Sequence, residues 1–182
     1  MSISREEAAS ALSQIDQTTS RSLDMKSYRI VGPILMAWGV IWAVGYCGMG
    51  VLPPRRLGWM WLGLDVLGIG LALIIRRRYG GATSRAWRHA AATAAIIAFV
   101  FVTQHLFRAS SPGPDLIYPG LVCGFAYVMI GLWRLHRLAW IGLAMFVASL
   151  AGLYLIPQGL NYWMAAVGGI GLFLGGLWLR KV

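Results

Sequence analysis

Six long apolar segments, joined by short polar connections, constrain the fold of this chain more than any other feature. They lie at residues 30–51, 57–75, 90–107, 116–133, 138–156 and 159–179. As helices, segments of this kind cross a hydrocarbon core of about 30 Å. Only 12% of the 182 residues are charged, and the mean hydropathy is +0.66, so polar side chains are too few to cover a soluble fold. The sequence therefore predicts an all-α integral membrane protein with a bundle of six transmembrane helices.

The first 17 residues carry the signals of a short helix. Ser4, followed three residues later by Glu7, has the spacing of a capping box. Apolar side chains then recur at helical spacing, at Ala8, Leu12 and Ile15. The pattern predicts a short amphipathic helix at residues 4–17, which either lies against the bundle or the lipid headgroups or docks a cytoplasmic protein partner.

A polar run, TTSRS at residues 18–22, predicts a joint between this short helix and the first apolar segment. We therefore expect a cytoplasmic N-terminal arm at residues 1–29 and a transmembrane domain at residues 30–182. The arm has no apolar core of the signal-peptide type, so no cleavable secretory signal is expected.

Basic residues gather on one side of the predicted bundle. Of the 16 Lys and Arg residues, all but Arg55, Arg56 and Arg108 lie in the arm, in the connections at 76–89 and 133–137, or after residue 179. Six crossings place all of these on one side, and the positive-inside rule makes that side the cytoplasm. We expect a multi-pass protein of a bacterial inner membrane with both termini cytoplasmic. Its basic residues fit anionic lipid headgroups, and nucleic acid is not expected as a partner.

The second, fourth and sixth segments end in similar short sequences: GIGLALIIRRR at 68–78, GLWRLHR at 131–137 and GIGLFLGGLWLRK at 169–181. Each follows a turn that contains proline, which predicts three helical hairpins in series; chance similarity among glycine-rich segments is the alternative. The layout resembles the HdeD-type acid-resistance membrane proteins of bacteria, also small chains of three glycine-rich hairpins. The resemblance covers residues 30–181 and implies a role in the response to the environment; the arm and Asp65 lie outside its pattern.

Glycines at small-xxx-small spacing mark faces where helices approach closely, because dispersion replaces the hydrophobic effect inside lipid. Gly168, Gly171 and Gly175 form such a face on the sixth segment. This segment is therefore expected at the centre of the bundle or at a dimer seam.

Asp65 is the acidic residue inside the apolar segments, and no Lys or Arg lies inside any of them. At the helical rise it lies about 12 Å below the membrane surface. A carboxylate at that depth costs several kcal/mol unless it is paired, hydrated or protonated. The sequence therefore favours a neutral Asp65, or one surrounded by donors and water. Tyr127 and Ser149 are expected at a similar depth, where either would donate a hydrogen bond.

Two hypotheses account for Asp65. In the first, it exchanges a proton or binds a cationic solute in a cavity walled by Trp38, Trp42 and Tyr127, since aromatic faces attract cations. In the second, protonated Asp65 hydrogen-bonds a neighbouring helix and only fixes the packing. A separate outer vestibule is predicted from three polar residues, one of which is a histidine whose imidazole would sense acidity. These residues are Gln104, His105 and Asp115.

Enzyme signatures are missing from the sequence. There is no HExxH, GxSxG or P-loop motif, and the bundle lacks the second carboxylate of an aspartyl protease. Cys47 and Cys123 have no metal-binding spacing and are predicted to be packing residues, so neither a cofactor nor a metal is expected. The sequence favours a non-enzymatic sensor or stress-response protein that uses Asp65; a small proton- or cation-coupled transporter or channel is the alternative.

Overall fold

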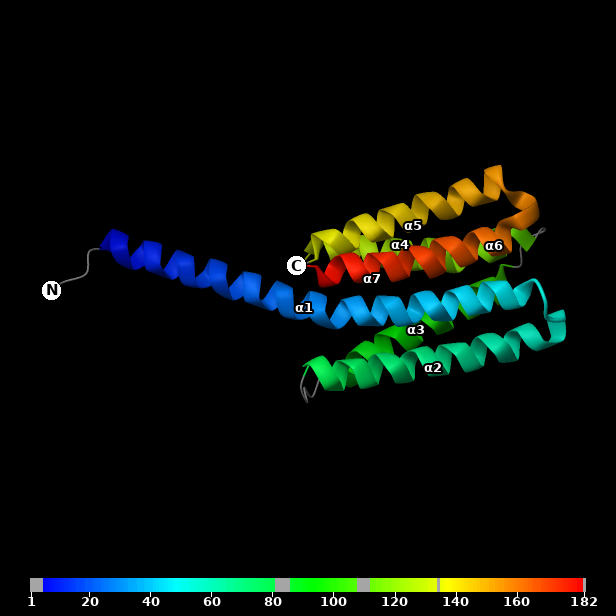
Figure 1. Cartoon of the computed structure of the whole chain (residues 1–182), viewed down its shortest axis with the longest axis horizontal. Coiled ribbons are helices and arrows are strands. Elements are labelled where there is room, and N and C mark those ends of the chain that lie inside the picture. The colour runs from blue at the N-terminus through cyan, green and yellow to red at the C-terminus, as the bar shows by residue number, and fades with distance from the viewer. Residues whose placement is uncertain (1–4, 81–85, 108–111, 134, 182) are drawn as a thin grey trace.

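A computed structural model describes residues 5–80, 86–107, 112–133 and 135–181, which form helices and short turns without a strand among them. The first five helices are α1 (Arg5–Met49), α2 (Pro54–Gly80), α3 (Ala86–Leu106), α4 (Pro112–Trp133) and α5 (His136–Leu155). The last helical stretch comprises the 3-10 turn η1 (Pro157–Gly159), α6 (Leu160–Met164), the π-helix η2 (Ala165–Gly171) and α7 (Leu172–Arg180). We call Pro157–Arg180 the last helix (Figure 1).

Five stretches are long and apolar enough to cross a membrane, as predicted for a multi-pass protein. They are Ser27–Met49, Pro54–Tyr79, Pro112–Trp133, His136–Leu155 and Pro157–Arg180. The apolar helix described in α3, Ala91–Leu106, is shorter than these five. The predicted crossing at residues 90–107 therefore stays a prediction.

The outer face of α2 shows why a membrane suits this fold. Val66 and Ile74 are 64% and 61% exposed, and Leu62 and Leu67 are exposed beside them. A soluble monomer rarely exposes so continuous an apolar surface, because water makes it costly. In lipid, the same surface has no such cost.

The arm differs from the prediction. Residues 18–22 do not form a joint, because α1 continues without a break from Arg5 to Met49 and projects out of the bundle as a single rod (Figure 1). No glycine or proline precedes Gly32, so nothing in the polar run stops the helix. The hydroxyl of Thr18 donates to the Gln14 carbonyl oxygen at 2.7 Å, a side-chain-to-backbone bond that forms across one helical turn. The predicted capping residue Ser4 lies outside the described residues.

The helices also pair differently from three hairpins in series. The most extensive contacts join α4 to α5 and α1 to the last helix, whereas α3 touches α4 only slightly. Glycine placement explains this pairing, because a Cβ added to Gly124 of α4 would lie 2.9 Å from the Gly142 carbonyl oxygen of α5. A Cβ on Gly39 of α1 would likewise lie 2.7 Å from the Gly169 carbonyl oxygen of the last helix. Only glycine allows backbones to approach this closely.

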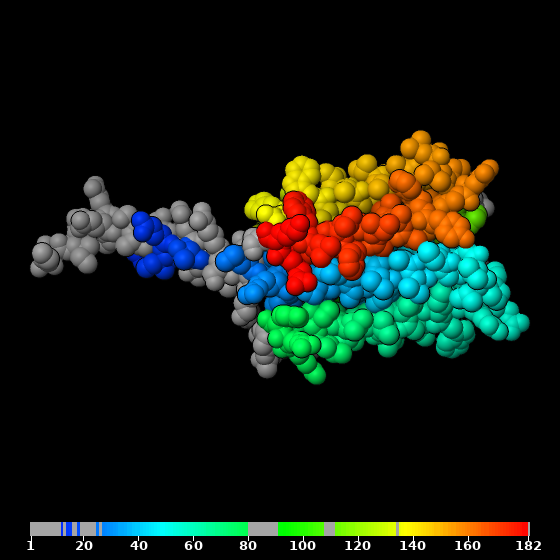
Figure 2. Space-filling view, viewed as in Figure 1, coloured from blue at the N-terminus to red at the C-terminus, as the bar shows by residue number. Residues whose placement is uncertain are grey.

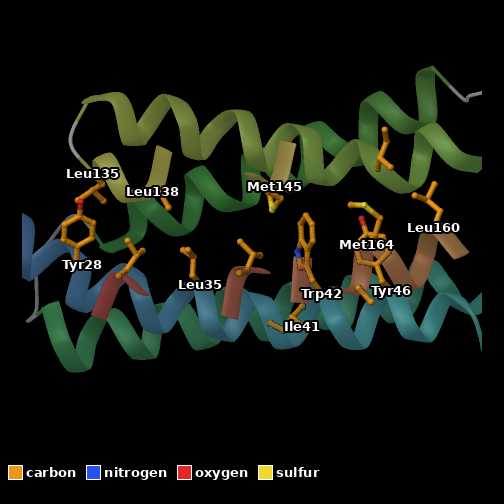
Figure 3. Packing of buried hydrophobic residues seen from close by; sticks show 14 residues of the cluster. Tyr28, Leu35, Ile41, Trp42, Tyr46, Leu135, Leu138, Met145, Leu160 and Met164 are labelled. Carbon is orange, nitrogen blue, oxygen red and sulfur yellow. The ribbon is translucent and has the colours of Figure 1, made fainter. Parts of the chain in front are cut away.

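The last helix lies in the middle of the bundle, which is the first of its two predicted positions. It packs between α1 on one side and α5 on the other (Figure 2). Its Met164, Leu172 and Leu179 are fully buried and meet Leu35 and Trp42 of α1 in the core shown in Figure 3. This packing holds α1 rigidly, and α1 in turn presents its other side to α2.

One end of the bundle, here called the terminal end, holds the C terminus, the end of α2 and the place where the arm leaves (Figure 1). The other end, here called the opposite end, holds the turn between α1 and α2 and the turn before the last helix (Figure 1). α4 begins at Pro112, where proline fits the first helical turn.

Candidate functional site

A cavity of about 1330 Å³ lies between α1, α2, α3 and α4. α1 and α2 pack on each other, but α3 makes few contacts with α2 and α4 and so leaves a space beside them. The cavity extends along the bundle from Ser27 near the terminal end to Asn161 near the opposite end. Its volume exceeds the 300–1,000 Å³ that is usual for small-molecule sites.

One face of α2 forms a wall of this cavity. Trp61, Asp65, Ile69 and Arg76 all line it. They are separated by four, four and seven residues, the spacing that keeps side chains on one side of a helix. Asp65 is half-buried and lies eleven residues from the start of α2, about 16 Å along the helix axis. The carboxyl group therefore lies well inside the bundle and faces the cavity.

Aromatic side chains form the wall of α1 that faces Asp65. The rings of Trp42 and Tyr46 meet edge to face with centroids 5.7 Å apart, and those of Tyr46 and Trp61 do so at 5.4 Å. The Tyr46 hydroxyl donates to the Leu116 carbonyl oxygen of α4 at 2.8 Å. This bond joins α1 to α4 and holds the aromatic wall in place, since buried Tyr hydroxyls need such partners.

Small residues make room for the indoles. A Cβ on Gly68 of α2 would lie 2.7 Å from the ring of Trp38, so the absence of a side chain allows Trp38 to pack directly against α2. Gly168 in the π-helix plays the same part for Trp42. The glycines thus position the two indoles that the sequence had placed on one face.

The two ends of the cavity differ in polarity. At the opposite end, Gln104, Asp115, Gln158 and Asn161 line it, and the Gln104 side-chain amide donates to the backbone carbonyl oxygen of Asp115 at 2.6 Å. At the terminal end, Arg76 lines it. The lining therefore carries acidic groups at the opposite end and in the middle, and a basic group at the terminal end.

The structure brings together most of the predicted site residues. Six of them line this one cavity: Trp38, Trp42, Asp65, Gln104, Asp115 and Tyr127. Two of the three residues of the predicted outer vestibule, Gln104 and Asp115, thus line the same cavity as Asp65. These two residues approach each other because α3 and α4 meet at the opposite end of the bundle.

Two predicted residues lie elsewhere. Ser149 does not line the cavity; it is fully buried, donates to the Met145 carbonyl oxygen of its own helix at 2.8 Å, and faces Gly120 of α4. Its side of α5 is the one packed on α4. His105 is exposed and does not line the cavity either, because it follows Gln104 by one residue and so points about 100° away.

Many lining residues were missing from the predicted site, among them Trp61, Arg76 and Cys123. Arg76 was counted among the basic residues that meet lipid headgroups, and Cys123 was predicted to be a packing residue. The helical period would have found Trp61 and Arg76, because both share a face with Asp65. Cys123 carries no such signal, since its position depends on how α4 rotates against α1. Cys47 is exposed, so its predicted packing role is wrong.

Among the described residues, no group of three or more His, Cys, Asp or Glu side chains is placed to hold a metal ion. The cavity instead offers one carboxyl group, several aromatic faces and apolar walls, which suit a cation with an apolar body. No protein-family model, no curated protein and no solved structure matches the chain in the three comparisons.

Proposed function

We propose that this multi-pass membrane protein binds a cationic, partly apolar solute in the cavity, with Asp65 as its counter-ion. The observation that carries the proposal is that Asp65 lines a cavity of about 1330 Å³ together with Trp38, Trp42 and Tyr127. A carboxyl group that only fixes helix packing would be enclosed by a partner helix. Asp65 instead faces open space wide enough for a solute.

Charge complementarity supports a cation as the ligand. Asp115 at the opposite end and Asp65 in the middle attract positive charge along the cavity, and low-dielectric walls strengthen that attraction. Indole and phenol faces add cation–π attraction, worth about 2 kcal/mol when water is excluded. An apolar body then occupies the remaining wall, which is mostly aliphatic.

Transport is the role that the cavity favours. Transporters and channels place their coupling group near the middle of the membrane, in a cavity formed by several helices. Asp65 is suited to that task, either as the site of the cation or as a group that exchanges a proton with it. This was the alternative function from the sequence, and the open cavity is the reason to prefer it.

A sensor is the second candidate, and the continuity of α1 is the observation that favours it. The same helix lines the cavity through Trp38 and Trp42 and extends out of the bundle to Arg5. A solute that moved these indoles would move the arm as one rigid rod. The arm would then present the change to a cytoplasmic protein partner.

The charge distribution supports a bacterial-type inner membrane with both termini cytoplasmic. Arg77 and Arg78 end α2 at the terminal end, where Arg180 ends α7. The positive-inside rule orients such an end toward the cytoplasm. The acidic end of the cavity then faces outward, where a cationic solute would enter.

Binding of tetraphenylphosphonium, a cation with apolar rings, tests the proposal. The full chain in detergent is expected to bind it saturably in equilibrium dialysis. Asp65→Asn should weaken binding at least about tenfold, the equivalent of about 1.4 kcal/mol, because it removes the counter-ion while keeping the shape. Uptake by vesicles that contain the protein would then distinguish transport from sensing.

Asp24→Asn is the matched control, since it makes the same chemical change in the arm. It should leave binding unchanged. Equal binding by the Asp65→Asn variant and the unmodified chain would contradict the proposal, provided both variants melt at similar temperatures.

A further inference from the structure

Arg76 at the terminal end of the cavity is not explained by a cation site. Its Nε is buried and has no hydrogen-bond partner among the described residues. The next two arginines of α2, Arg77 and Arg78, are exposed. Arg76 therefore differs from its neighbours: it lines the cavity, while they remain on the surface.

An unpaired guanidinium nitrogen in a buried place requires a partner, because buried donors without one are rare and costly. Asp65 lies on the same face of α2 but eleven residues away, about 16 Å along the axis, which is beyond ionic contact. The acceptor that suits a guanidinium is a planar or tetrahedral oxyanion, a carboxylate or a phosphate.

The surroundings of Arg76 indicate the source of that anion. Arg76 directly follows Ile75, the last residue of the apolar stretch, so it lies at the level of the lipid phosphates. Beyond it, the cavity wall toward Asp65 is aliphatic, with Ile34, Ile69 and Leu73. A polar head at Arg76 and an apolar chain along this wall together match a lipid.

We infer that the terminal end of the cavity is a binding site for an anionic phospholipid. The phosphate accepts hydrogen bonds from the Arg76 guanidinium, and one acyl chain lies along α1 and α2 toward Asp65. Basic pockets between membrane helices recognise anionic headgroups in this way. A free phosphate ion would satisfy Arg76 but leave the aliphatic wall uncovered. The site does not depend on the cation proposed above.

Native mass spectrometry of the full chain in detergent tests the site. Phosphatidylglycerol should bind at least about tenfold more tightly than phosphatidylcholine with the same acyl chains, because the choline cation offsets the phosphate charge in phosphatidylcholine, whereas the phosphatidylglycerol headgroup is a net anion beside the Arg76 guanidinium. Arg76→Gln should remove this preference. Arg77→Gln, the same change on an exposed neighbour, should retain it.

Two further measurements keep the inference testable if Arg76→Gln fails to fold. Inorganic phosphate at millimolar concentration should leave the lipid bound; binding of phosphate alone, with no preference for the anionic lipid, would overturn the assignment. A photoreactive group in the acyl chain should label Ile69 or Leu73 inside the cavity. Labelling confined to Val66, Leu67 and Ile74, on the outer face of α2, would overturn it as well.

Discussion

Asp65 and Arg76 place opposite charges at different positions along the cavity. They lie on one face of α2, about 16 Å apart along its axis, with the acidic group in the middle and the basic group at the terminal end. Under the proposed function, a cation that entered from the opposite end would pass Asp115, would be held at Asp65 and would meet repulsion from Arg76. An anionic headgroup on Arg76 would reduce that repulsion, so the two proposed ligands would favour each other's binding.

Tyr46 is the residue whose hydrogen bond fixes the aromatic wall. Tyr46→Phe removes the bond to the Leu116 carbonyl oxygen while keeping the ring contacts with Trp42 and Trp61. We expect a loss of about 0.6–1.5 kcal/mol in the free energy of unfolding, the range for single hydrogen bonds between helices. Tyr154→Phe, on an exposed residue, should have no effect in the same denaturation measurement. Equal effects of the two changes would contradict this role.

Which residues form the site was predictable in part from the sequence. Asp65 was identified because a lone carboxyl group in an apolar segment is costly, and Trp38 and Trp42 because they are one helical turn apart. Ser149, in contrast, does not line the cavity. Counting residues predicts how far along a helix a residue lies, but not how the helix is rotated about its axis. Only the packing of α5 on α4 fixes that rotation.

At the scale of elements, α1 combines two environments in one helix. Its part from Ser27 onward is a candidate membrane span, and its first 22 residues extend about 33 Å beyond it. The sequence predicted a break because Ser and Thr favour turns. The break does not occur, because these residues also support a helix when no glycine or proline intervenes.

The continuity of α1 predicts a single, narrow distance between spin labels at Leu12 and Arg29, both of which are exposed. Seventeen residues of α-helix place their backbones about 26 Å apart. Ser20→Pro should broaden and change that distance, because proline disrupts the preceding helical turn. Pulsed electron paramagnetic resonance checks this after Cys47 and Cys123 are replaced. An equally broad distribution with and without Ser20→Pro would show that α1 is jointed.

Close contact between α4 and α5 depends on the absence of a side chain at Gly124. Gly124→Val should lower the free energy of unfolding by about 1–3 kcal/mol, because its side chain would meet the backbone of α5. Gly63→Val in α2 is the matched control, since a Cβ there has no heavy atom within 4 Å. Thermal denaturation in detergent compares the two. Equal losses would mean that the α4–α5 contact is not backbone to backbone.

For the whole molecule, the sequence predicted the order of the helices well but not their partners. Segment length and hydropathy fix where a helix runs, because each crossing must satisfy its own backbone. Partner choice depends on small faces such as Gly39 and Gly169, and many glycines compete for that role. The three-hairpin arrangement therefore stays a prediction: α1 packs on α2 and α5 packs on the last helix, but α3 touches α4 only slightly. The helix boundaries agree to within a few residues for most segments.

Whether the chain crosses the membrane five or six times depends on whether α3 spans it. If α3 spans the membrane, an accessibility tag after Gly80 and a tag just before Pro112 lie on opposite sides. The first should be cytoplasmic and the second external, together with a tag in the turn between α1 and α2. Impermeant labelling of intact cells checks all three. Tags on both sides of α3 that label alike would show that α3 does not cross.

The accessibility of position 65 tests the central claim most directly. In a background with Cys47 and Cys123 replaced by alanine, Asp65→Cys should react with a membrane-impermeant thiol reagent in sealed vesicles, and tetraphenylphosphonium should slow that reaction. Leu67→Cys, on the lipid-facing side of α2, should stay unreactive. If a thiol at position 65 proved as unreactive as one at position 67 from both sides of the membrane, no solute-accessible cavity would reach Asp65.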